Sequence, residues 1–170
     1  MDSWGALACR RRRGEDGAAA VEFALLVPVI CLVVFATISY AYMFSFRQAL
    51  SQAAAEGARA SVGATVSGSC AATAASYPAA TCPAQAAAAA AVARSLDGYG
   101  MTCNGTAHLT CAITPPTACA GAASGSPSGG QCVTVTVSYP YRDHDLLPSV
   151  PGIGFTLPET LRFSSTVVVR

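Results

Sequence analysis

The feature that most constrains this chain is an apolar run of 29 residues, 18–46, in which Glu22 is the only charged residue. As an α-helix the run would be about 43 Å long, at roughly 1.5 Å per residue. A bilayer core needs about 20 apolar residues, whereas the apolar part of a cleaved signal peptide usually has about 7–15. The sequence therefore predicts a transmembrane helix over 18–46.

The residues on either side of the run predict its orientation. The leader, 1–17, contains four consecutive arginines, and the outer end of the run is aromatic. Positive charges stay cytoplasmic and aromatic rings gather at the interfaces, so we expect a cytoplasmic amino end and an extracytoplasmic chain from about residue 47. The arginines are Arg10, Arg11, Arg12 and Arg13, and the aromatic residues are Tyr40, Tyr42 and Phe44.

Beyond the run the helix is expected to continue over 47–62. This segment is rich in Ala, Gln, Glu and Arg, all of which are strong helix formers. Small residues recur there every fourth position, at Ala49, Ala53, Gly57 and Ser61. Such a stripe lets another helix approach closely. The alternative is that alanine is simply common in this chain, so both interpretations stay open.

The remaining residues, 63–170, predict one small extracytoplasmic α+β domain. A loop over 63–81 precedes a second helix, which begins at Pro83 and packs against the sheet or the first helix, with Gly98 at the position just past its end. Its outer face is expected to carry Gln85, Arg94 and Asp97. Alternating apolar residues then predict three antiparallel strands, in 107–113, 131–142 and 161–170, separated by irregular segments at 115–130 and 143–159.

Proline and cysteine add constraints to this domain. Pro140 lacks an N–H, so strand pairing should end there or face an edge. Six cysteines follow the span, an even number that indicates disulfides in an exported domain. Among 15 possible pairings we favour the sequential one, because each bridge then closes a local loop. The six are Cys70, Cys82, Cys103, Cys111, Cys119 and Cys132.

Other chemistry finds little support in the sequence. Cys103, His108 and Cys111 could form part of a metal site, but a closed zinc site needs four ligands and no CxxC-like pair is present. The Asp–His pair within 142–145 stands beside no recognisable nucleophile, so a solvated loop is the simpler interpretation. A net charge of +1 gives no reason to expect nucleic acid. We therefore predict no enzyme, no metal or other cofactor, and no small-molecule substrate.

Glu22 needs its own explanation, because an ionised group within a membrane is unfavourable by about 2.5–3.5 kcal/mol or more. The carboxylate could simply sit among the headgroups. Alternatively, a cut after Gly17 would create a cationic amine on Ala18, and Glu22 of one subunit could pair with the amine of a neighbour. A buried polar pair of this kind sets the register between subunits.

These residues resemble the amino terminus of type IV pilins and pseudopilins, in which a basic leader ends in glycine and the fifth mature residue is glutamate. The match extends to the TadE family of tight-adherence pilus assembly proteins. Its features here are the AVEFAL sequence of 20–25, Pro28 within the span, the AEGAR sequence of 55–59 and the terminal strands. The resemblance covers about 20–62 and 132–170.

The resemblance implies a non-enzymatic pseudopilin or minor pilin of the bacterial cytoplasmic membrane. Its implied partners are a prepilin peptidase, which cuts between Gly17 and Ala18, other pilin-like subunits, and an inner-membrane assembly platform. Pro28 would loosen the helix, and Ala53 and Gly57 would serve helix packing. The alternative is an uncleaved, signal-anchored extracytoplasmic module that binds a partner of the cell envelope and makes no demand on Gly17 or Glu22.

Overall fold

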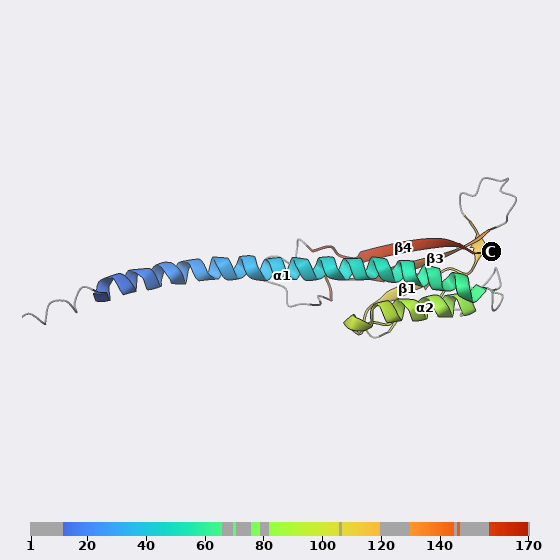
Figure 1. The fold of residues 1–170 in the computed structure, drawn as a ribbon, viewed down its shortest axis with the longest axis horizontal. Helices are drawn as coiled ribbons and strands as arrows, with labels where there is room; N and C mark the ends of the chain where they lie inside the picture. The colour runs from blue at the N-terminus through green and yellow to red at the C-terminus, as the bar shows by residue number, and fades with distance from the viewer. Residues whose placement is uncertain are drawn as a thin grey trace, which may run out of the picture. The chain divides into compact units, whose positions relative to one another are not determined.

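The computed structural model describes residues 12–65, 70, 76–78, 82–105, 107–119, 130–144, 146 and 157–169, with side chains from Gly17 onward (Figure 1). It divides into two compact units, Met1–Ala41 and Tyr42–Arg170, which we describe separately. Arg10 and Arg11 lie outside the described residues, as do the side chains of Arg12 and Arg13. The orientation that depends on these arginines therefore remains a prediction.

Helix α1 extends over Arg12–Thr65 and contains Pro28. It begins six residues before the expected start at residue 18 and ends three residues after the expected end at residue 62. The leader from Arg12 to Asp16 contains Arg and Glu, which favour a helix, and Gly14, which disfavours it, but no proline. Without a proline, the helix can extend into the leader.

Helix α2 extends over Pro83–Ser95 and is followed by a short 3₁₀ helix, η1, over Asp97–Tyr99. Gly98 is therefore not the terminating residue that we predicted. The left-handed residue is Gly100, with φ of 65°, and its N–H donates to the carbonyl of Asp97 at 2.8 Å. Leu96 ends α2 through a bond to the carbonyl of Val92 at 3.1 Å.

Gln85 is fully buried, so its predicted place on the outer face of α2 is wrong. Its amide nitrogen donates to the carbonyl of Ile113 at 2.9 Å, and its amide oxygen accepts the N–H of Cys82 at 3.1 Å. The side chain thus satisfies one group at the start of α2 and one in the sheet. Helical periodicity alone does not distinguish this buried amide from a solvated one.

The sheet has four strands, and the long central one is β3, over Gln131–Tyr139. Antiparallel to it lie β4, Leu161–Val169, on one edge and both β1, Thr110–Ile113, and β2, Thr117–Ala118, on the other. The β3–β4 register pairs Val135 with Ser165. β3 ends immediately before Pro140, as the missing N–H predicts.

The first edge of the sheet differs from its prediction in two ways. β1 starts at Thr110 rather than at residue 107, because His108 has a positive φ of 59° and lies in the turn closed by Asn104. β2 was not predicted and lies within the segment 115–130 that was expected to be irregular. Two residues are too few to produce a recognisable alternation.

The core forms where the helices cover one face of the sheet. Buried side chains come from α1, α2 and the alternating inward row of β3, as the predicted α+β fold requires. The opposite face of the sheet carries hydroxyl groups that pair across strands, including Thr134 with Thr166 at 2.9 Å and Thr110 with Ser138 at 2.6 Å. The largest buried core residues include Phe46, Leu50, Val92, Leu96, Val133, Val135 and Val137.

Candidate functional site

The amino-terminal motif lies entirely within α1. Gly17, Ala18 and Glu22 are exposed, and a Cβ added at Gly17 would meet no atom within 4 Å. Ala18 and Glu22 are four residues apart, so they lie one turn apart on the same face of the helix. The motif is therefore accessible, and an amine on Ala18 would begin the turn that carries the Glu22 carboxylate.

The surface around this motif is apolar on every side of the helix. Val21, Phe23 and Leu25 are 63%, 69% and 71% exposed, and exposed aliphatic residues continue to Ile38. A helix that is apolar all round is buried in a core or spans a membrane. Within the described residues, one helix, between Gly17 and Ala64, is long and apolar enough to cross a bilayer.

Pro28 lies inside this apolar part of α1 and is exposed. Proline has no N–H to donate to the carbonyl four residues earlier, and its ring crowds that carbonyl. The helix nevertheless continues through it to Thr65. Pro28 therefore leaves one helical hydrogen bond unmade and marks the point where α1 bends most easily.

The small-residue stripe has a partner within the chain. Ala53, Gly57 and Ser61 are buried. A Cβ added at Gly57 would lie 2.9 Å from Cγ2 of Val92 in α2 and 3.2 Å from Cγ1 of Val135 in β3. The stripe therefore lets α2 and β3 of the same chain approach α1.

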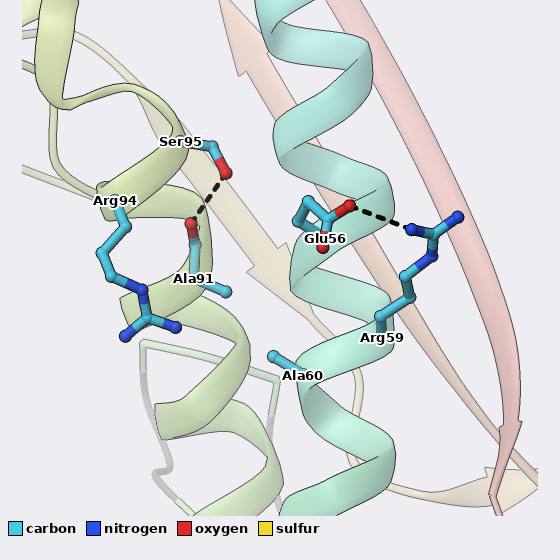
Figure 2. A pocket seen from close by; sticks show the side chains of 6 residues that line it. All are labelled: Glu56, Arg59, Ala60, Ala91, Arg94 and Ser95. Atoms are coloured by element: carbon cyan, nitrogen blue, oxygen red, sulfur yellow. Dashed lines mark hydrogen bonds and ion pairs between the residues drawn. The ribbon is translucent and has the colours of Figure 1, made fainter.

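A shallow groove runs between α1 and α2 beside this contact (Figure 2). Its floor includes Ala60 and Ala91, and Glu56 forms an exposed ion pair with Arg59 at 3.0 Å. Arg94 and Ser95 complete the lining, and the Ser95 hydroxyl donates to the carbonyl of Ala91 at 3.0 Å. The polar groups drawn there are thus largely engaged with their own helices.

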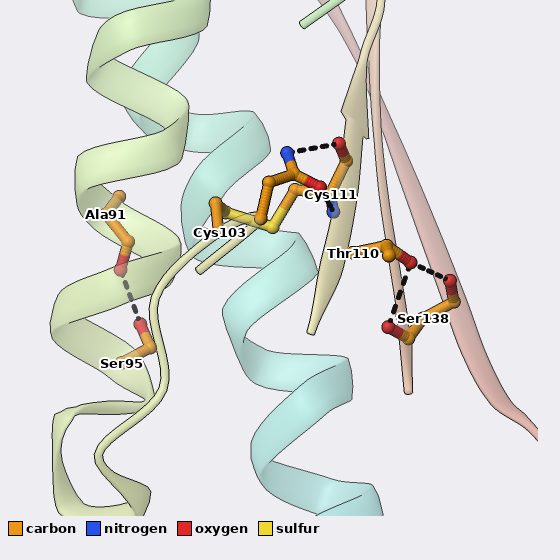
Figure 3. The surroundings of a disulfide bond; sticks show 7 residues. Ala91, Ser95, Cys103, Thr110, Cys111 and Ser138 are labelled. Atoms are coloured by element: carbon orange, nitrogen blue, oxygen red, sulfur yellow. Dashed lines mark hydrogen bonds between the residues drawn. A yellow bond between two sulfur atoms is a disulfide. The ribbon is translucent and has the colours of Figure 1, made fainter. Parts of the chain in front are cut away.

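The six cysteines form three disulfides in sequence order: Cys70–Cys82, Cys103–Cys111 and Cys119–Cys132. The second of these lies close to α2 and β1 (Figure 3). Its sulfur atoms are bonded to each other, so the alternative in which Cys103 and Cys111 hold a metal with His108 does not fit. Cys31 is a free thiol on the exposed surface of α1, and Cys9 lies outside the described residues.

The 142–145 segment is structural at the positions described. The Arg142 guanidinium binds Glu159 at 2.7 Å and the carbonyl of Leu157 at 2.7 Å, so it ties the end of β3 to the approach to β4. The ring of His144 stacks on that of His108, with centroids 3.4 Å apart. Sequence reasoning missed both contacts, because they join residues that are distant in the chain.

These features define a class of protein before any comparison. One amino-terminal apolar helix, which fits a single-pass membrane anchor, continues into a small α+β domain with three disulfides.

Comparison with known families then narrows the class. The family model described as TadE-like protein matches residues 17–59, from the glycine of the amino-terminal motif to Arg59. This match confirms the predicted resemblance to the TadE-like family over that part of the chain, and it indicates a protein related to the Tad pilus. No curated protein and no solved structure matches the chain.

Proposed function

We propose that this protein is a TadE-like pseudopilin or minor pilin that acts in assembly of a tight-adherence, Flp-type pilus and so in adhesion. The observation that carries the proposal is the exposed Gly17–Ala18–Glu22 motif on an apolar helix, at the point where the family match begins. The role is non-enzymatic and works through helix packing with other pilin-like subunits. The amino end is cytoplasmic, and the α+β domain lies outside the cytoplasmic membrane.

Processing by a prepilin peptidase between Gly17 and Ala18 would change the electrostatics of α1. The helix now begins at Arg12, so Glu22 lies nearly three turns from its amino end. After the cut, the helix would begin at Ala18, with Glu22 one turn from its amino end. An acidic side chain near a helix amino terminus is stabilising, and the new amine adds a full positive charge.

Glu22 would then set the register between subunits. A carboxylate surrounded by lipid is unfavourable unless it is paired, and the amine on a neighbour's Ala18 supplies the pair. Pro28 lies six residues further along and weakens the helix locally. We infer that this weakness helps the subunit leave the lipid as the assembly platform moves it.

Amino-terminal sequencing tests the processing step. Protein purified from membranes of cells that contain the peptidase should start at Ala18, and protein from cells without it should start at Met1. Gly17→Leu should leave Met1 in place, whereas the matched variant Gly14→Leu should still be cut. An intact Met1 in the first sample would contradict processing and favour the uncleaved, signal-anchored binding module.

A Glu22→Ala variant tests the register role. We expect normal membrane insertion, because removing a charge from lipid is favourable, but pilus output reduced about tenfold or more, since the neighbour's amine loses its partner. Glu56→Gln is the control, because Glu56 pairs with Arg59 at the exposed surface of the same helix. Normal pilus output from Glu22→Ala would contradict the role.

A further inference from the structure

A second groove lies on the opposite side of α1 from α2, at the carboxyl end of the apolar run. It is lined by residues from α1 and β4, all within the unit Tyr42–Arg170, and has a volume of about 290 Å³. Figure 1 shows β4 running beside this part of α1. The lining residues are Phe44, Arg47, Gln48, Ser51 and Phe163.

Two aromatic rings give the groove an apolar surface. Phe44 is 53% exposed, whereas Phe46 and Leu50, which follow it on α1, are fully buried. Phe163 belongs to the inward row of β4 and is partly exposed at the edge of the sheet. An exposed phenyl ring at the end of a membrane-spanning run is well placed to contact lipid.

The Arg47 guanidinium lies over this apolar surface. Arg47 is the first cationic residue after Arg13, and it directly follows the apolar run. Its guanidinium carbon lies 5.8 Å from the ring centroid of Phe163, within cation–π range. Among the described residues it has no ion pair, so its N–H groups can receive an anion from outside the chain.

We propose that this groove binds one anionic phospholipid of the leaflet from which α1 emerges. The Arg47 guanidinium donates to the lipid phosphate, the Gln48 amide and Ser51 hydroxyl bind the polar headgroup, and the upper acyl chain contacts Phe44 and Phe163. Charge complementarity and continuity with the apolar run carry the assignment. A volume of about 290 Å³ leaves room for a lipid headgroup. The inference rests on the membrane topology in the proposed function.

Lipid co-purification tests the site. The full chain is incorporated into nanodiscs of equal phosphatidylglycerol and phosphatidylcholine, extracted in mild detergent, and analysed by native mass spectrometry for retained lipid. We expect phosphatidylglycerol to dominate, and Arg47→Gln to lower its excess about fivefold, the factor expected for one arginine near an anionic surface. Arg94→Gln, which removes an exposed arginine from α2, should change nothing.

A reporter inside the groove gives a second measurement. Phe163→Trp, combined with Trp4→Phe to remove the native tryptophan, should be quenched more by brominated phosphatidylglycerol than by brominated phosphatidylcholine. Adding Arg47→Gln should remove that difference. Equal quenching by both lipids, or an equal loss of bound lipid in Arg47→Gln and Arg94→Gln, would overturn the site. Neither assay requires the peptidase or a pilus, so failed processing or assembly leaves the result readable.

Discussion

Helix α1 passes through two environments, and its side chains differ accordingly. Before Tyr42, large apolar residues are exposed on all sides, as Leu25 and Phe35 show at 71% and 58%. After Tyr42, Phe46 and Leu50 are fully buried, and the exposed face becomes polar apart from Phe44 and Val62. Buried positions there recur at helical spacing: Met43, Phe46, Leu50, Ala53, Ala54, Gly57, Ala58 and Ser61.

The difference shows that the two parts of one helix are stabilised differently. Helix propensity and backbone hydrogen bonds stabilise α1 along its whole length. Burial of side chains within the protein stabilises it only after Tyr42. The first part is expected to bury its surface in lipid, or against other helices. Pairs of substitutions can separate these contributions to stability. One pair compares α1 before and after Tyr42, and the others compare its buried and exposed faces.

The largest effect is expected at Phe46. Its ring lies 5.1 Å from the rings of both Tyr99 and Tyr139, measured between centroids, and it is fully buried. Phe46→Ala should lower the free energy of unfolding of the α+β domain by about 3–5 kcal/mol. This loss can be measured by denaturant titration in detergent, with near-UV circular dichroism of the tyrosines as the signal. Phe35→Ala should leave this transition in place, and equal effects of the two variants would refute the division of α1.

An intermediate effect is expected at Gly57, where α1 touches α2 and β3. Gly57→Ala places a Cβ 2.9 Å from Val92, whose branched side chain has little freedom to move, and should destabilise the domain by about 1–3 kcal/mol. Gly63→Ala in the same helix meets no atom within 4 Å and should instead stabilise by about 0.5–1 kcal/mol. In thermal unfolding, the midpoint temperature should fall for Gly57→Ala and rise for Gly63→Ala.

The smallest effect is expected on the exposed face. Glu56 and Arg59 form a pair whose side chains are 52% and 75% exposed, and such pairs contribute less than about 0.5 kcal/mol. Glu56→Gln should therefore shift the unfolding midpoint only slightly, and less still at high salt. A loss above about 1 kcal/mol would show that this face is buried against something else.

Much of the fold was predictable because it rests on periodicity and on residues with strong local preferences. The continuous apolar run, the alternation in β3 and β4, and Pro140 each act over a few neighbouring residues. The α+β class follows from them. The resemblance at the amino terminus could likewise be read from 17–59, since it depends on the identity and spacing of consecutive residues.

What could not be predicted depends on contacts between distant segments. Gln85 is polar, yet it is buried because Ile113, 28 residues away, offers it a carbonyl. β2 exists because Thr117 meets Cys132 on the central strand. The groove beneath Arg47 forms only when β4 brings Phe163 beside α1. The residues next to Gln85, Thr117 and Arg47 in the sequence do not indicate which distant residues these three will contact.

The order of the disulfides has a consequence for export. Each bridge joins two consecutive cysteines of the domain, across 12, 8 and 13 residues, so no bridge encloses a cysteine of another. In the proposed topology the amino end stays in the cytoplasm and the domain crosses the membrane from about residue 47 onward, so each cysteine pair would be complete before the next one emerges. An oxidase that joins cysteines in their order of arrival would then make the native set directly, without correction by an isomerase.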